Sequence, residues 1–226
     1  EVEEEADPLA AAPVLYRLSQ AVGKQRRFAD EEALLRRALT AVEAARGPDG
    51  ASDQDAMMRY RVLCSLHAVR AATCPADRLD DEATGFARRA LFVAERHYGP
   101  AHAQTADSLY RVAAALCRRA EYLEAEQFLH RALAIQTRTH GERHPETGRV
   151  LCALAQVYKR MCMFERAARY DRLWRLCPPL PKHPRGTQLA AASASNAAAA
   201  AKFAGEPPQL SHLSSHGGGG GGGGGG

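Results

Sequence analysis

The sequence is poor in aromatic residues and has no long apolar run. Aromatic side chains make up 6% of the 226 residues, with a single tryptophan. No segment approaches the roughly 18–20 consecutive apolar residues that a membrane span needs. The opening Glu1-Val2-Glu3-Glu4-Glu5 also differs from the basic-then-apolar design of a secretory signal. We therefore expect a soluble, cytoplasmic protein without a membrane partner, with cytoskeletal association as a further option.

The sequence also lacks the patterns of a metal site, a disulfide scaffold or an active site. Its six cysteines show no CxxC pairing, so we expect free thiols. His140 and His144 are four residues apart, but Gly141 breaks the helix between them. No glycine-rich phosphate loop follows a strand, and no cysteine is tied to a catalytic base. We predict no metal site, no cofactor and no enzyme activity.

An internal repeat of 42 residues is present instead. The phrase Arg89-Ala90-Leu91 returns as Arg131-Ala132-Leu133, and Phe86 returns as Phe128. A first copy, displaced by 94 residues from the third, contains Arg37-Ala38-Leu39, and a fourth begins at Val150. Because the composition is rich in Ala, Leu and Arg, each copy is expected to be a pair of helices.

The repeat predicts an all-α fold: a right-handed α-solenoid of about four antiparallel helix pairs over residues 13–177. Residues 1–12 are expected to be a flexible acidic leader, and residues 178–226, rich in Pro, Ala and Gly, a disordered tail. We expect helices to begin and end at the following residues: Pro13–Arg26 and Ala29–Arg46, Asp53–Ala72 and Asp80–His97, Ala103–Arg118 and Leu123–His140, Pro145–Arg160 and Phe164–Leu176. The corresponding pairs span 13–47, 53–99, 103–141 and 145–177.

These phrases resemble the tetratricopeptide repeat family. The 42-residue period, with Arg131-Ala132-Leu133 and the junction Gly141-Glu142-Arg143-His144-Pro145, is similar to the kinesin-light-chain subtype. The resemblance covers roughly residues 13–176 and is strongest from 79 to 168. It implies a protein–protein interaction adaptor or scaffold, in which the first helix of each pair lines a concave peptide-binding groove. In the fourth copy Trp174 stands where Ala is expected, and we expect it to cap the array.

Basic and aromatic residues recur at the positions that the resemblance assigns to this groove. A Tyr-Arg pair occurs three times, and basic residues follow seven positions later, on the same helix face. Arginine forks suit carboxylates, so we predict a groove for an acidic peptide. The predicted groove residues are Tyr16, Arg17, Lys24, Tyr60, Arg61, Tyr110, Arg111, Arg118 and Arg160.

Three alternatives stay open at this point. The arginines can pair with acidic side chains of neighbouring helices, or stay solvated, instead of binding a ligand. An RNA-binding helical array is the second, although the net charge of only +4 and the acidic second helices disfavour nucleic acid. The third is a regulatory repeat region of a larger multidomain protein. The sequence pattern leaves the oligomeric state and the partner open.

Overall fold

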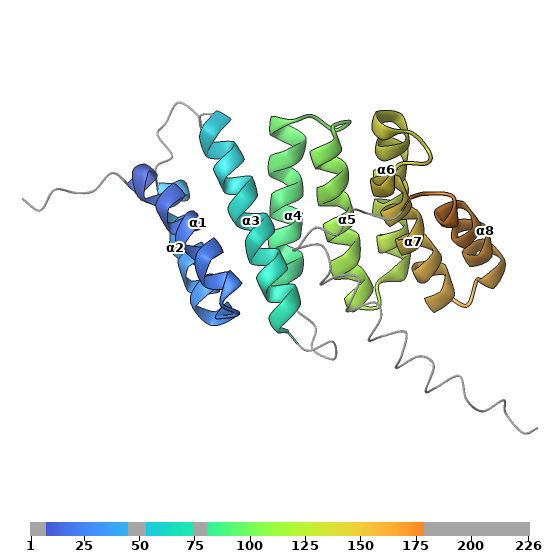
Figure 1. Ribbon diagram of the computed structural model, residues 1–226, viewed down its shortest axis with the longest axis horizontal. Helices are drawn as coiled ribbons and strands as arrows, with labels where there is room; N and C mark the ends of the chain where they lie inside the picture. The colour runs from blue at the N-terminus through green and yellow to red at the C-terminus, as the bar shows by residue number, and fades with distance from the viewer. Residues whose placement is uncertain (1–7, 45–52, 75–80, 179–226) are drawn as a thin grey trace, which may run out of the picture. The chain divides into compact units, whose positions relative to one another are not determined.

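A computed structural model describes residues 8–44, 53–74 and 81–178, with side chains from Ala11 onward. In this part of the chain every regular element is a helix, and turns connect the helices. Eight helices follow one another in order from α1 to α8 (Figure 1). Their bounds are α1 (Pro8–Lys24), α2 (Phe28–Ala44), α3 (Asp53–Thr73), α4 (Asp81–His97), α5 (Ala103–Arg118), α6 (Tyr122–His140), α7 (Pro145–Arg160) and α8 (Phe164–Arg175).

The predicted all-helical fold is confirmed, and each expected helix is present. Helix α1 begins at Pro8, five residues before the expected start, so Pro13 lies inside it. Most of the predicted leader and tail lie outside the described residues. Among the helices that the structure describes, none combines the length and apolar character needed to cross a bilayer.

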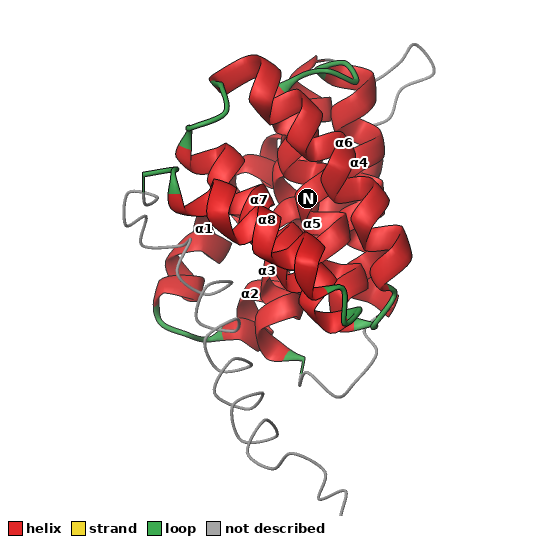
Figure 2. Cartoon of the chain, turned by 90° about the vertical axis from the view of Figure 1, so that its right-hand side faces the viewer, coloured by secondary structure: helices red, strands yellow, loops and turns green. Residues whose placement is uncertain are grey.

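The helices pack as pairs, and the pairs pack side by side. Each helix contacts the next one along the chain, and α1 also contacts α3 as α5 contacts α7. Helices account for nearly all of the described backbone, and short loops join α1 to α2 and the successive helices from α4 to α8 (Figure 2). The predicted groove residues all belong to the first helices of the pairs, α1, α3, α5 and α7. We call the surface formed by these helices the first-helix face.

Small residues on the second helices allow neighbouring pairs to approach closely. Ala38, Ala90 and Ala132, the alanines of the three Arg-Ala-Leu phrases, are fully buried. Large aliphatic side chains such as Leu63, Leu109 and Leu154 fill the space around them. A larger residue at these alanine positions would push two helices apart, since interiors are packed to near-crystalline density.

A repeated turn joins one pair to the next. Gly99 and Gly141 both have φ near +90°, in the region open to glycine, as the repeat pattern predicted. Three residues later a histidine caps the next helix: Nδ1 of His144 accepts a hydrogen bond from the Glu146 amide at 3.2 Å. The hydroxyl of Thr147 then donates to the Gly141 carbonyl at 2.8 Å. The copy before it repeats this arrangement, so the junction geometry is locally encoded.

The turns inside the first, third and fourth pairs use a different device. Arg26, Ala120 and Cys162 occupy equivalent positions and have φ values of 61°, 61° and 59°. None is glycine, so each turn carries a local strain of about 1 kcal/mol. Backbone hydrogen bonds hold this conformation, as in Glu121 N to Leu116 O at 3.0 Å. The sequence pattern did not predict these turns.

Ion pairs link the second helices across pair boundaries, and we call this set the charge ladder. Each rung joins an arginine of one second helix to a glutamate of its neighbour. The pairs are Arg36–Glu82 at 2.8 Å, Arg88–Glu124 at 2.7 Å, Arg131–Glu95 at 2.7 Å, and Arg89–Glu43. Such exposed pairs contribute about 0–1 kcal/mol each. The ladder therefore aligns α2, α4 and α6 more than it stabilises them.

One buried histidine makes the fold sensitive to acid. His67 on α3 is 3% exposed, and its Nδ1–H donates to the Ala83 carbonyl of α4 at 3.0 Å. Burial lowers the pKa of His67 to about 4. The unfolded chain binds a proton at this side chain near pH 6.5, whereas the folded chain does not. Stability from neutral His67 is therefore present above pH ~6.5 and is lost as the pH falls towards about 4.

We expect His67→Asn to flatten this pH dependence. The asparagine amide can still donate near the Nδ1 position but does not titrate. The wild type should lose on the order of 3 kcal/mol more than the variant between pH 7 and 4. Urea unfolding followed by circular dichroism at several pH values measures this difference. The exposed His140→Asn serves as the control, and parallel curves for wild type and His67→Asn would contradict the assignment.

Candidate peptide-binding face

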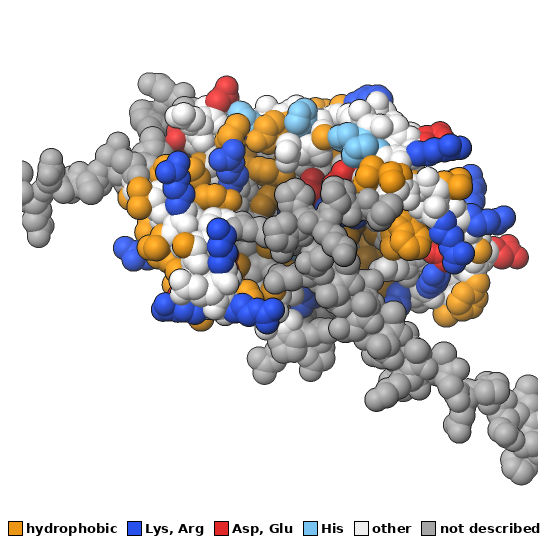
Figure 3. Space-filling view, in the orientation of Figure 1, with side chains coloured by type: hydrophobic (Ala, Val, Ile, Leu, Met, Phe, Trp, Pro, Cys, Tyr) orange, Lys and Arg blue, Asp and Glu red, His pale blue; other side chains and the backbone are white. Residues whose placement is uncertain are grey.

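The first-helix face carries four exposed cations. Arg17 and Lys24 lie on α1, Arg61 on α3 and Arg160 on α7, and each is exposed. None forms a hydrogen bond or ion pair with a residue that the structure describes. In the view of Figure 3, Lys and Arg side chains lie over the α1–α3 end and again over the α7–α8 end. These four cations therefore have no partner in the described part of the chain.

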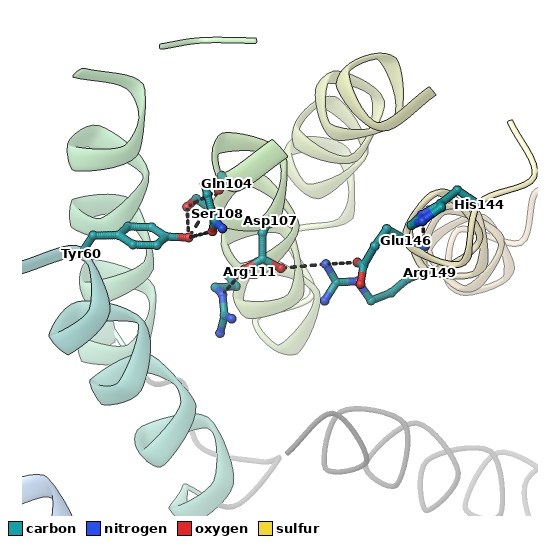
Figure 4. Close-up of polar contacts among 8 residues, drawn as sticks. All are labelled: Tyr60, Gln104, Asp107, Ser108, Arg111, His144, Glu146 and Arg149. Atoms are coloured by element: carbon teal, nitrogen blue, oxygen red, sulfur yellow. Dashed lines mark hydrogen bonds and ion pairs between the residues drawn. The ribbon is translucent and has the colours of Figure 1, made fainter. Parts of the chain in front are cut away.

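Tyr60, predicted for the groove, is used for packing instead. It is 7% exposed, and its ring meets Tyr98 edge-on at 5.8 Å. Its hydroxyl donates to Gln104 Oε1 at 3.2 Å and accepts from Ser108 Oγ at 3.3 Å (Figure 4). The next pair thus covers this side chain completely, and Tyr60 is not available to a ligand.

The other two tyrosines are half-buried. Tyr16 packs against the apolar cluster that α1 to α4 share. Tyr110 lies beneath the guanidinium of Arg149, whose Cζ is 4.4 Å from the ring centre. Because the cation covers the ring face, Tyr110 contributes to a ligand surface only through Arg149.

Asp107 on α5 holds two arginines of the same face. Its carboxylate accepts from Arg111 Nε at 2.8 Å and from Arg149 Nη2 of α7 at 2.7 Å. Arg149 also pairs with Glu146 at 2.8 Å, so the charges form a chain across α5 and α7 (Figure 4). Burial alone would raise the pKa of Asp107, but the two guanidinium groups outweigh it and lower the pKa to about 2. The carboxylate is therefore ionised at neutral pH.

Arg118 is tied to the backbone of the preceding pair. Its guanidinium donates to the Ala71 carbonyl and, at 2.8 Å, to the Cys74 carbonyl, where α3 ends. A cation at this position satisfies carbonyls that have no helical partner. Arg118 thus donates hydrogen bonds to the carbonyl groups at the C-terminal end of α3.

The structure therefore divides the predicted site residues. Arg17, Lys24, Arg61 and Arg160 remain open to a ligand, Arg111 is already paired, and Arg118 and Tyr60 bind neighbouring pairs. Three residues of the network were not predicted: Asp107, Glu146 and Arg149. The spacing of four residues between Asp107 and Arg111 on one helix was the available signal. The described residues contain no cluster of three or more metal-ligating side chains.

Asp107→Asn should destabilise the array. At pH 7 the variant loses the ionised carboxylate and leaves Arg111 and Arg149 with a neutral acceptor, at a cost of about 2 kcal/mol. The folded pKa of Asp107 is depressed, so its contribution is present above pH ~4 and is lost as the pH falls towards about 2. Urea unfolding at pH 7 and at lower pH should show the two proteins converging in acid.

The exposed carboxylate of Glu142 provides the matched control for this prediction. Glu142→Gln removes the same charge from the turn between α6 and α7 without touching the network. We expect it to leave the free energy of unfolding nearly unchanged. Equal effects of the two substitutions would mean that net charge, rather than the Asp107 network, sets the stability.

Comparison with known proteins agrees with this architecture. Residues 104–172 match the family model of the tetratricopeptide repeat. No curated protein sequence matches the chain.

Several solved structures share the fold. The crystal structure of BtubC (BKLC) from P. vanneervenii is 20% identical to this chain, with a TM-score of 0.63. The alignment covers 80% of this chain and 71% of that one. The apo form of RapI is 18% identical, with 90% and 73% coverage and a TM-score of 0.63. Kinesin light chain-like repeats of Podosopora anserina match at 14% identity, with 76% and 96% coverage and a TM-score of 0.45.

The matched family model covers the third helix pair and most of the fourth, where the sequence resemblance is strongest. The two structures with the higher TM-scores extend the similarity of fold over most of the chain. The predicted tetratricopeptide-like helical array is thereby confirmed, and residues 104–172 carry the tetratricopeptide repeat that the family model matches.

Proposed function

We propose that this chain is a protein–protein interaction scaffold whose first-helix face binds an acidic segment of a partner protein. The tetratricopeptide repeat is typical of such scaffolds, which supports the general role. The acidic ligand follows from the surface charge. The observation that carries it is that four cations of the first helices, Arg17, Lys24, Arg61 and Arg160, are exposed and have no partner in the described chain.

The paired arginines support the same ligand. Asp107 occupies Arg111 and one edge of Arg149, which orders both guanidinium groups on the face. An ordered guanidinium loses less conformational entropy when it binds a carboxylate. The acidic ligand would therefore meet mobile cations on α1 and α3 and pre-positioned ones on α5 and α7.

A nucleic-acid ligand fits this face less well. Asp107 and Glu146 place two carboxylates between the cations of α3 and those of α7. A continuous phosphate backbone crossing the face would meet this negative charge, whereas a peptide can place its few carboxylates elsewhere. The spacing of charges favours a discrete acidic peptide, and no catalytic role is proposed.

Reversal of two open cations tests the proposal. Arg17→Glu/Arg61→Glu should weaken binding of an acidic partner about tenfold or more, because attraction becomes repulsion at two positions. Full-length wild type and variant are compared in pull-downs from lysate, and a labelled peptide from the captured partner then gives Kd by fluorescence anisotropy. Equal helicity by circular dichroism confirms that the variant is folded.

A control with the same change of net charge isolates the face. Arg37→Glu/Arg96→Glu reverses two exposed arginines on the second helices α2 and α4. The proposal requires that this control keeps the partner. It fails when the two variants lose the partner equally, or when neither does.

A further inference from the structure

The last helix differs from the other second helices in charge. Helix α8 carries four arginines in 12 residues: Arg166, Arg169, Arg172 and Arg175. None of them forms an ion pair with a carboxylate of the described chain. The acidic residue Asp171 is taken by Lys159 at 2.6 Å. Helix α8 thus holds a dense group of unpaired cations.

The charge ladder explains how this arises. Glu82 and Glu124 receive the arginines of the preceding helices, and the equivalent residue 42 positions later is Arg166. Arg131 binds Glu95 backwards along the array, and its equivalent on α8 is Leu173. Both kinds of rung are therefore missing between α6 and α8, and positive charge accumulates on the last helix.

Apolar side chains lie among these arginines. Leu173 and Leu176 are exposed, and Trp174 is 41% exposed. Trp174 stands at the position where Ala38, Ala90 and Ala132 are covered by neighbouring helices. Arg169, Arg172, Leu173 and Leu176 share one side of α8, and Trp174 lies towards Gly148 of α7. We call the exposed surface of these four residues, with the exposed edge of Trp174 at its border, the α8 end face. It combines cations with aliphatic and aromatic contacts, as expected for a surface that binds an acidic segment.

The chain itself contains a complementary segment. Residues 1–7 carry five acidic side chains and no basic one, and they lie outside the described residues. Arg111 and Arg149 are partly neutralised by Asp107, and the exposed cations Arg17, Lys24, Arg61 and Arg160 are spread over three helices. Four arginines lie within the 12 residues of α8, so the positive charge that complements residues 1–7 is concentrated there.

This segment cannot reach the α8 end face of its own chain. Seven extended residues span at most about 25 Å. Helix α1 packs on α2 and α3, whereas α8 packs mainly on α7 at the other end of the array (Figure 1). Three steps between pairs, at about 10 Å each, already exceed that reach before the segment crosses the last pair.

We infer that the chain associates head to tail, with the acidic residues 1–7 of one copy bound to the α8 end face of another. Such an interface joins two different surfaces. Each assembly therefore keeps one unbound acidic segment and one unoccupied α8 end face, to which a further copy can bind. Association then grows with concentration and weakens with salt. This inference does not rest on the ligand of the first-helix face.

Sedimentation velocity of the full chain is the first test. The weight-average sedimentation coefficient should rise with protein concentration between about 1 µM and 1 mM, the range in which weak protein contacts form. Raising the salt from about 0.05 M to 0.5 M should reverse the rise, because exposed charges are screened. A coefficient that stays at the monomer value throughout the low-salt series overturns the inference.

Charge exchange then identifies the two surfaces. Glu3→Lys/Glu4→Lys/Glu5→Lys leaves two acidic and three basic side chains and so makes the segment basic, and Arg169→Glu/Arg172→Glu makes the α8 end face acidic. Each variant alone should associate about tenfold or more weakly than wild type, because like charges then face each other. An equimolar mixture should associate again, since each variant supplies the complement of the other. Arg175 is unchanged so that the variant places one carboxylate rather than two in the last turn, where negative charge opposes the helix dipole.

Two further proteins keep the test decisive. A single chain carrying all five reversals should associate as wild type does, a result that a misfolded α8 cannot give. Arg17→Glu/Arg61→Glu, which alters the first-helix face, should leave self-association unchanged. Failure of the mixture and of the fivefold variant to associate overturns the inference. Loss of association in the first-helix variant alone would instead place the acidic segment on that face, and the inference would again be wrong.

The single tryptophan gives an independent measurement. Trp174 is the only tryptophan of the chain and lies at the border of the α8 end face. A synthetic peptide of residues 1–12 is titrated into the full-length Glu3→Lys/Glu4→Lys/Glu5→Lys variant. The fluorescence emission of Trp174 should shift and then saturate as the peptide binds. The same peptide with lysine at positions 3, 4 and 5 is the control. Identical titrations with the two peptides contradict an acidic ligand at this face.

Discussion

The close approach of neighbouring helix pairs is the constraint on which the rest of the structure depends. Ala38, Ala90 and Ala132 lie at the contacts between pairs and expose no surface. Since one pair alone cannot bury its apolar face, the array is stable only when these contacts form. The side chains that surround the contacts must therefore fit the next pair before they can serve a ligand.

This constraint decides how each polar residue of the first-helix face is used. Tyr60 and Arg118 lie near pair boundaries, where Ser108 and the end of α3 require hydrogen-bond partners. Arg17 and Arg61 lie farther from such demands and stay exposed. Asp107 stands between these cases, because it joins α5 to α7 and also fixes two cations on the surface. Stability and ligand binding thus share this network.

The helices and the turns between pairs could be predicted because their signals are local. The 42-residue period, the buried alanines and the Gly141-to-His144 junction each belong to one stretch of chain. The burial of Tyr60 could not be predicted in this way, because it depends on Gln104 and Ser108, more than 40 residues later. The strained turn at Ala120 was also missed, since alanine gives no sign of a positive φ. The sequence predicted the groove residues as one set. Tertiary contacts divide this set into exposed cations and residues that pack or pair within the array.

The end of the array shows what happens when the packing constraint is removed. No helix follows α8 in the described part of the chain, and at the fourth alanine position Trp174 stands with 41% of its surface exposed. The ladder glutamates have no counterpart either, so Arg166 replaces them and the helix becomes basic. A helix that continued the array would meet a large ring and uncompensated positive charge. The same substitutions that stop the repeat therefore create a surface suited to an acidic segment, which separates this end from the first-helix face.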